Sequence, residues 1–216
     1  MSSTQFHHQR GVSLIETLVA LFILALGITA ALSLLGYVSG ITAGTKNRII
    51  ATNLAREGIE AVRNIRDSNW LFYGEGGARD HWNDGWEGDE NPGAKREYKL
   101  VLQADLNQQF SYRLVEILLP APNPPLPDEE ARVYLRSGIV GLPETAPVYT
   151  QAEGEGEPSI YSRRLIISYP TETDAGGAGN NIVNVDSIVT WYERGIAKKI
   201  ELSTKLSDWW QRSDHS

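Results

Sequence analysis

One carboxylate lies in a stretch of the chain that has almost no other charge. Glu16 follows Gly11 by five residues and directly precedes 29 uncharged residues, Thr17 to Thr45. A carboxylate at bilayer depth costs about 2.5–3.5 kcal/mol on insertion scales, so such a residue is a functional-site hypothesis by default. A cation in the same low-dielectric layer would compensate its charge. Cleavage after Gly11 would create such a cation, the free α-amine of Val12.

The uncharged run must be the element that positions this carboxylate. About 20 residues are enough for a helix to cross a bilayer, and 29 residues at about 1.5 Å each extend roughly 43 Å. A secretory signal peptide is one alternative, with Val38-Ser39-Gly40 as a weak cleavage site, but its apolar region usually covers only about 7–15 residues. A plain single-pass anchor fits the length and leaves Glu16 unexplained.

The residues around Glu16 resemble the cleavage and methylation signature of type IV prepilins. The sequence from Gly11 to Leu21 reads GVSLIETLVAL and follows a polar leader. In that family a membrane aspartyl peptidase cuts after the glycine and N-methylates the new first residue, and the fifth mature residue is glutamate. The resemblance therefore implies cleavage and methylation at Gly11 and Val12, and a role for Glu16 in assembly. Val12 departs from the phenylalanine that is commonest at the first mature position.

The tract 18–27 is most similar to PilV-type minor pilins and to minor pseudopilins of type II secretion. The resemblance implies a structural subunit and no enzyme: a minor pilin or pilin-like subunit of a type IV pilus or pseudopilus. The alternatives are a pseudopilin of a type II secretion system and a membrane-tethered adhesive module. The implied partners are the prepilin peptidase, other pilin subunits, the inner-membrane pilus assembly machinery and membrane lipid. Inside the filament, Glu16 would pair with the Val12 amine of a neighbouring subunit.

The resemblance also implies an orientation. A single-pass protein of the inner membrane would hold its globular domain outside the cytoplasm and later enter the pilus or pseudopilus. The basic residues Lys46, Arg48 and Arg56 follow the uncharged run, whereas Arg10 alone precedes it. The positive-inside rule by itself favours the opposite orientation. We follow the resemblance, because the rule is statistical.

A helical period continues beyond the uncharged run. Apolar or small residues recur on one face, at Ile50, Leu54, Gly58, Ala61, Val62 and Ile65, which predicts one helix over about 12–67 whose second half is amphipathic. The later sequence alternates with the period of strands, at 96–104, 110–119, 132–136, 160–169, 183–193 and 196–204. Arg194-Gly195 predicts a two-residue hairpin turn, after which Ile196, Ile200 and Leu202 alternate. The proline-rich stretch 120–127 and the predicted flexible loops 151–158 and 174–181 separate the strands.

These elements predict an α+β fold, with a long N-terminal helix followed by an antiparallel β-sheet globular domain, as in pilins. The expected organisation is a leader (1–11), a transmembrane and filament-core helix (12–45), its amphipathic continuation (46–73) and a β-rich globular domain (74–216). The chain has 216 residues, 20 Lys and Arg against 27 Asp and Glu, and a net charge of −7. This acidic balance argues against a nucleic-acid partner.

Few residues could support catalysis or bind a metal. The chain has no cysteine, and His81 is its one histidine far from an end, so we expect no catalytic residue, no cofactor and no histidine- or thiolate-based metal site. The acidic loop 74–94 does not fit the EF-hand pattern. An irregular calcium site remains open there, with Asp84, Glu87, Asp89 or Glu90 as ligands. Trp82 and Trp86 in the same loop either pack on the domain or form an exposed interface anchor.

Overall fold

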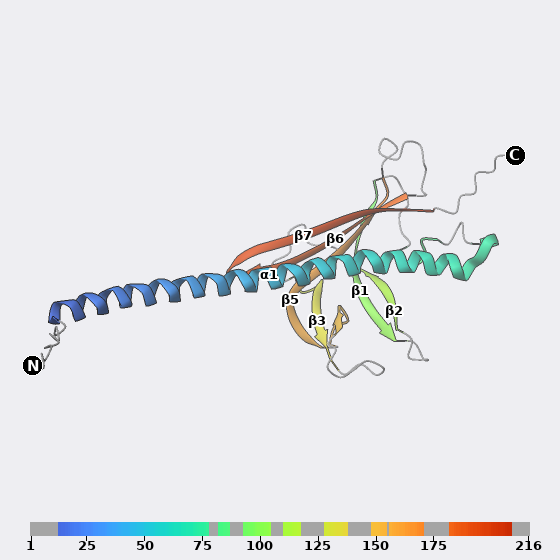
Figure 1. The fold of residues 1–216 in the computed structure, drawn as a ribbon. Helices are drawn as coiled ribbons and strands as arrows, with labels where there is room; N and C mark the ends of the chain where they lie inside the picture. The colour runs from blue at the N-terminus through green and yellow to red at the C-terminus, as the bar shows by residue number, and fades with distance from the viewer. Residues whose placement is uncertain are drawn as a thin grey trace, which may run out of the picture. The chain divides into compact units, whose positions relative to one another are not determined.

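In the part of the chain that the computed structural model describes, one helix, α1 (Leu14–Gly77), precedes seven strands (Figure 1). The structure describes residues 13–77, 82–86, 93–104, 110–117, 128–137, 148–154, 156–170 and 182–208. The chain divides into two compact units, an N-terminal unit (Met1–Asn47) and a C-terminal unit (Arg48–Ser216). The C-terminal unit contains the second part of α1 and the sheet. The predicted α+β fold, a long N-terminal helix followed by an antiparallel sheet, is confirmed.

The sheet branches at its central strand, and all its strand pairs are antiparallel. One edge of β5 (Glu157–Ser168) pairs with β6 (Ile182–Glu193), which pairs with β7 (Ile196–Ser207). The other edge is shared by β1 (Lys95–Ala104), which pairs with residues 165–168, and β3 (Arg132–Arg136), which pairs with residues 157–162. Strand β2 (Phe110–Glu116) pairs with β1, and the short strand β4 (Val148–Thr150) pairs with β3. Figure 1 shows β1 and β2 splayed away from β3.

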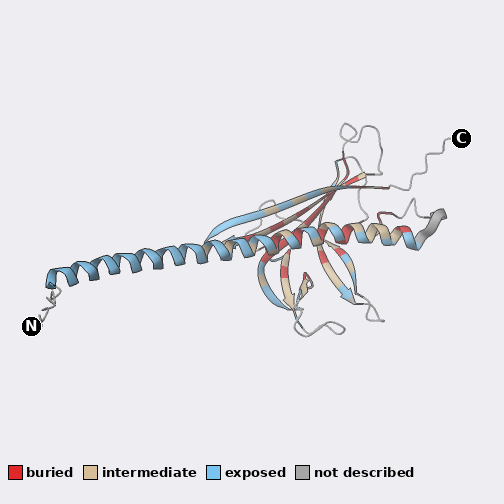
Figure 2. Cartoon of the chain, viewed as in Figure 1, coloured by how far each residue is buried: buried red, intermediate tan, exposed pale blue. Residues whose placement is uncertain are grey.

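The second part of α1 packs one face on this sheet, as the helical period predicts. Two clusters of buried side chains form along it, one around Leu54 and one around Val62. Between them, a Cβ at Gly58 would lie 2.6 Å from Leu165 Cδ2 and 2.6 Å from Ser187 Oγ. The helix backbone therefore approaches the sheet at a distance that only glycine permits. Figure 2 shows the buried residues of α1 confined to this part of the helix.

The β6–β7 hairpin confirms the predicted turn. Arg194 and Gly195 have φ values of 52° and 77°, as a type I′ turn requires at both central residues. Strand β6 buries every second residue from Val183 to Trp191, so one of its faces belongs to the core. Strand β7 is mostly exposed: Ile200 and Leu202 pack against the core, but Ile196 is exposed, which the alternation in the sequence did not predict.

Three details of the sequence prediction are wrong. Helix α1 continues to Gly77 instead of ending near residue 67, because Asn69 bonds to the turn 82–86 and Trp70 is buried in the core. Strand β4 was not predicted, since three residues are too few to show a period. The segment 151–158 is not a flexible loop throughout, because Gln151 is buried and β5 begins at Glu157. The stretches 120–127 and 174–181 lie outside the described residues.

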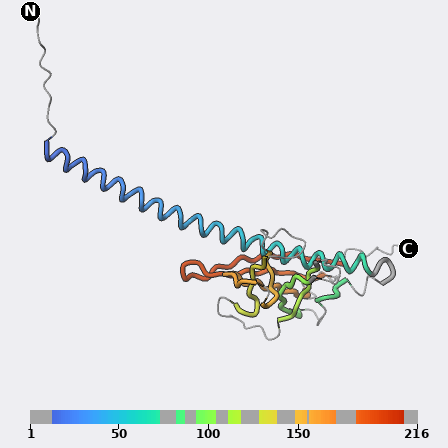
Figure 3. The backbone as a smooth tube through the Cα atoms, turned by 90° about the horizontal axis from the view of Figure 1, so that it is seen from below, coloured from blue at the N-terminus to red at the C-terminus, as the bar shows by residue number. Residues whose placement is uncertain are grey.

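Figure 3 follows the chain as a tube and shows β6 and β7 side by side with the second part of α1. Most buried side chains of the C-terminal unit come from α1, from the sheet face that the helix covers and from the turn 82–86. This arrangement leaves the opposite face of β6 and β7 without a covering element among the described residues. That face is mostly polar, with exceptions such as Ile188 and Tyr192 of β6, as is usual for a sheet with one solvated side.

Candidate functional site

The first turn of α1 holds the candidate carboxylate. The Ser13 carbonyl accepts hydrogen bonds from the amides of Glu16, at 3.0 Å, and Thr17, at 3.2 Å. Glu16 thus lies where the partial positive charge of a helix N-terminus favours an anion. Its side chain is exposed, and no described residue forms an ion pair with it. The predicted processing residues, Gly11 and Val12, lie outside the described residues.

The N-terminal unit exposes an apolar surface on every side of its helix. All the large apolar side chains from Leu14 to Ile41 are between 48% and 77% exposed. A helix of a soluble domain buries one apolar stripe, and a continuous exposed apolar surface indicates an interaction with lipid or protein. Figure 2 shows this stretch of the helix as exposed throughout. The surface therefore needs a cover of lipid or of protein.

The hydroxyl groups in this stretch are compatible with an apolar environment. Thr29 donates to the Ala25 carbonyl at 2.8 Å, Ser33 to the Thr29 carbonyl at 2.9 Å, and Thr42 to the Val38 carbonyl at 3.0 Å. Because hydrocarbon offers no partner, a hydroxyl bonded to its own helix avoids the cost of an unpaired polar group. By length and composition, α1 is the one helix in the described part of the chain that could cross a membrane.

The family described as the prokaryotic N-terminal methylation motif matches residues 6–32. The matched range contains Gly11, Val12, Glu16 and about half of the uncharged run. These residues carry a type IV prepilin-like signature. The match supports a type IV pilin-like or pseudopilin protein that is anchored in a membrane, and the signature belongs to structural subunits, not to an enzyme family. Comparisons with curated proteins and with solved structures gave no significant match.

The two tryptophans that could have formed an exposed anchor are buried. Trp82 is 4% exposed and Trp86 is 2% exposed, and their rings meet edge to face with centroids 6.0 Å apart. Asn69 of α1 donates to the carbonyls of Trp82, at 3.3 Å, and Asp84, at 2.9 Å. The Tyr98 hydroxyl donates to the Trp86 carbonyl at 3.2 Å. The turn 82–86 is therefore part of the core, and its tryptophans are not available as an adhesive surface.

The candidate calcium ligands and His81 come from the segment around the turn 82–86. Among the described residues, no group of three or more histidines or carboxylates could hold a metal ion. Asp84 belongs to the buried turn just described. Glu87, Asp89, Glu90 and His81 lie outside the described residues, so the irregular calcium site stays untested.

A buried polar cluster at the branch point of the sheet escaped the sequence analysis. Arg163 is 1% exposed, and its guanidinium donates to the Leu54 carbonyl at 3.1 Å, to Glu57 Oε2 at 3.0 Å and to Gln151 Oε1 at 3.0 Å. The Gln151 amide also donates to the carbonyls of Ala131 and Arg163, both at 2.8 Å, and accepts from the Leu100 amide at 3.0 Å. This side chain therefore occupies all four of its hydrogen-bonding positions where β1 and β3 separate along β5.

Burial in the C-terminal unit raises the pKa values of several tyrosines. Burial, followed by the charge of Glu116, raises the pKa of Tyr98 to about 12. Burial likewise raises the pKa of Tyr161 to about 12, and burial together with the nearby Glu57 carboxylate raises that of Tyr112. Tyr98 and Tyr161 belong to the two buried clusters that α1 forms with the sheet, and Tyr112 packs against the first of them. Their pKa values are properties of the packed core.

Proposed function

We propose that this chain is a minor pilin or a closely related pilin-like subunit. A prepilin peptidase removes residues 1–11 and methylates Val12, and the segment 12–45 then anchors the subunit in the inner membrane. One observation carries this proposal: the residues that match the methylation motif overlap the part of α1 whose large apolar side chains are all exposed. Membrane lipid covers that surface first, and the helices of other subunits cover it in the filament.

Glu16 sets the axial register in this proposal. Inside a bundle of apolar helices, the carboxylate pairs with the methylated amine of Val12 in a neighbouring subunit. A subunit in the wrong register leaves both charges without a partner. Loss of one partner of a buried ion pair costs about 3–5 kcal/mol, so the wrong register is disfavoured. The amphipathic continuation 46–73 carries the globular domain 74–216, which then forms the surface of the filament outside the cytoplasm.

Intact-mass measurement and N-terminal sequencing of the membrane-extracted protein test the processing step. The expected chain has 216 − 11 = 205 residues and begins at methylated Val12. The same protein from a host without prepilin peptidase is the control, and it should retain Met1 or Ser2. A chain that begins at Met1 in a host with an active peptidase would contradict the proposal.

The substitution Glu16→Ala tests the assembly role. We expect normal membrane insertion, because removal of the charge favours the bilayer, and at least about a 100-fold loss of incorporation if about 3 kcal/mol of pairing energy is lost. The measurement is the ratio of subunit in sheared filaments to subunit in membranes. The neighbouring substitution Thr17→Ala is the matched control. Undiminished incorporation of the Glu16→Ala subunit would refute the register mechanism.

A deletion distinguishes the pilus from the secretion system. If the subunit belongs to a type IV pilus, its loss should reduce the number of surface filaments seen by electron microscopy. If secretion of folded proteins fails while surface filaments remain, the subunit is a pseudopilin of type II secretion. In either case, expression of the full chain in the deletion strain should restore the lost filaments or the lost secretion. This complemented strain is the control.

A further inference from the structure

The exposed apolar side chains of the C-terminal unit gather at one end of its sheet. Apart from those on α1, the described residues include three large apolar side chains with exposures above 40%: Ile160 at 48%, Tyr192 at 45% and Ile196 at 59%. Tyr192 and Ile196 flank the turn of the β6–β7 hairpin. Because Tyr161 pairs with Trp191, the next residues of the two strands, Ile160 and Tyr192, lie at this same end.

Cations outnumber carboxylates around these apolar side chains: Arg194, Lys198 and Lys199 lie there with Glu193, which is opposite Ile196, and Glu201. Arg194, Lys198 and Lys199 are all exposed. Lys199 pairs with Glu201 at 2.7 Å on the surface, whereas no described residue forms an ion pair with Arg194 or Lys198. Arg194 occupies a left-handed position that type I′ turns usually fill with Asn, Asp or Gly. A charged residue that is retained in an unfavourable backbone conformation suggests that its side chain has a function.

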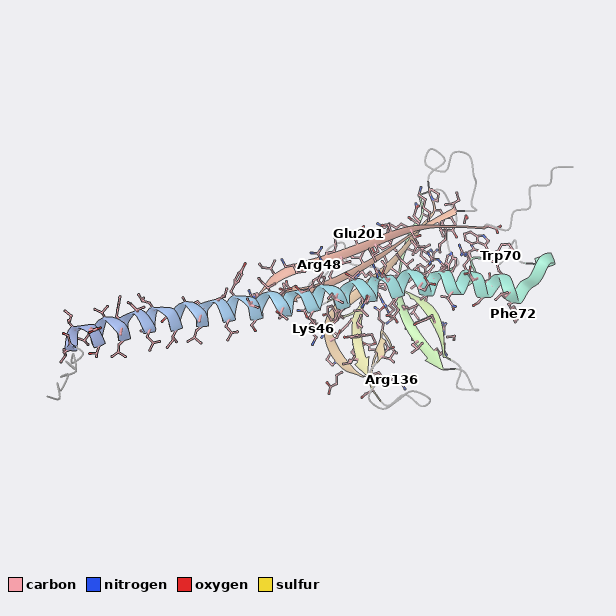
Figure 4. All side chains as sticks on the ribbon, in the orientation of Figure 1. Lys46, Arg48, Trp70, Phe72, Arg136 and Glu201 are labelled. Carbon is pink, nitrogen blue, oxygen red and sulfur yellow. The ribbon has the colours of Figure 1, made fainter. Side chains whose placement is uncertain are left out.

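This end of the sheet is the end at which the chain enters the C-terminal unit. Trp191 and Val189 pack with Ala51 and Leu54, near the start of the unit, whereas Val183 belongs to the cluster around Val62 and Trp70. Figure 4 labels Arg48 and Glu201 toward one end of the unit and Trp70 toward the other. Along the chain, only Lys46 and Asn47 separate Arg48 from the uncharged run.

We propose that this hairpin end, the β6–β7 tip (Ile160, Tyr192, Arg194, Ile196, Lys198 and Lys199), binds the anionic headgroups of the membrane that α1 spans. An amphipathic aromatic side chain, aliphatic side chains and basic residues together are the chemistry of an interfacial membrane contact. Each Lys or Arg near an anionic lipid surface adds electrostatic attraction. The tip thus fixes the globular domain on the bilayer while the subunit waits to enter a filament.

We assign lipid as the binding partner of the β6–β7 tip because of where the tip lies relative to the course of the chain. A protein partner could use the same three apolar side chains, but the tip belongs to the end of the unit that follows directly on the membrane-spanning run. The inference therefore rests on the membrane anchoring in the proposed function. It does not depend on processing at Gly11 or on the identity of the filament system.

The absence of cysteine from the sequence makes a clean test possible. Ala197→Cys and Ser203→Cys place a single thiol on the same exposed face of β7, one at the tip and one about 20 Å along the strand. Each full-length variant is labelled with an environment-sensitive fluorophore and reconstituted in vesicles with about 30% anionic phospholipid. Spin-labelled lipids then quench the fluorophores. We expect quenching at residue 197 to exceed quenching at residue 203 by about twofold or more.

Charge and apolar variants separate the two contributions to binding. Replacing Lys198 and Lys199 by Gln in the Ala197→Cys background should reduce quenching toward the level at residue 203, as should vesicles of zwitterionic lipid or about 0.5 M salt. Tyr192→Ser in the same background should also reduce it. Thermal unfolding that matches the parent protein shows that each variant is folded.

Two outcomes would overturn the inference. One is equal quenching at residues 197 and 203. The other is a shift of the emission of the fluorophore at residue 197 that appears only when another pilin-like chain is added and that is not accompanied by quenching by the lipids, which would identify a protein partner. Flotation of the same vesicles distinguishes failure of the further inference from failure of the anchoring. A chain that does not float with lipid contradicts the proposed function, whereas a chain that floats with equal quenching contradicts only the contact of the tip.

Discussion

The substitution Gln151→Leu should lower the thermal stability strongly, although the two side chains have similar volumes. Gln151→Leu removes an amide that is 2% exposed and accepts and donates hydrogen bonds at the branch of the sheet. The orientation of this amide is fixed by its partners, because the Leu100 amide and Arg163 Nε can only donate and the two carbonyls can only accept. A leucine of similar size would fill the space and satisfy none of these groups.

The cost can be worked out group by group. The Ala131 carbonyl keeps the hydrogen bond that it accepts from the Arg163 amide at 2.8 Å. The Leu100 amide and Arg163 Nε lose the acceptor that Gln151 provides. Each buried group left unsatisfied costs about 1–3 kcal/mol, so two such donors give about 4 kcal/mol. For a unit of this size, about 1 kcal/mol corresponds to a shift in Tm of roughly 2–4 °C, which predicts a decrease of about 8–16 °C.

Thermal unfolding of the detergent-solubilised full chain, followed by circular dichroism, measures this shift. Gln103→Leu is the matched control, because Gln103 lies on β1 and is exposed. That substitution should change the Tm by no more than about 2 °C, as is typical of surface positions. If Gln151→Leu lowered the Tm no more than Gln103→Leu does, the buried amide would not hold the branched sheet together and the reasoning would be refuted.

Three further predictions concern the C-terminal unit. Gly58→Val should lower the Tm by about 2–12 °C, since an overpacked core costs about 1–3 kcal/mol, whereas Gly36→Ala, where a Cβ meets nothing within 4 Å, should not. Tyr98 and Tyr161, whose pKa values are raised to about 12, should ionise about two pH units above free tyrosine in an ultraviolet titration. Because the folded pKa exceeds the unfolded value of 10.0, their contribution to stability is complete below pH 10 and is lost as the pH rises toward about 12. Arg194→Asn should raise the Tm slightly, because asparagine tolerates the φ of 52° better than arginine does.

The elements that the sequence predicts well are those with a strong local signal. The helical face that includes Leu54, Gly58 and Val62 repeats over several turns, and the Arg194-Gly195 turn is bounded by two long alternating strands. The last turns of α1 show no such period, because Leu71 and Phe72 are exposed. Their helical form depends instead on the hydrogen bonds of Asn69 to the turn 82–86 and on the burial of Trp70 in the core, neither of which is a periodic pattern in the sequence.

The polar cluster was missed for a different reason. Arg163 and Arg164 are consecutive in β5, and a strand places neighbouring residues on opposite faces. Arg164 forms an ion pair with Glu97 at 2.5 Å, and Arg163 enters the core on the face that α1 covers. From the sequence, either arginine could have been the one on the face that α1 covers. The buried position of Gln151 follows only from the branching of the sheet, which depends on pairings between distant strands.

Gly58 and Arg163 together give α1 one register on the sheet. A slide of the helix by one turn would bring Leu54 or Val62 to the position of Gly58, where even a Cβ lies 2.6 Å from Leu165 and Ser187. The same slide would replace Glu57 by Asn53 or Ala61, neither of which carries a charge to pair with Arg163. Apolar packing alone tolerates such shifts, since both neighbouring turns offer apolar residues. The close approach and the buried ion pair exclude them, so the register rests on the two positions that least resemble an ordinary apolar face.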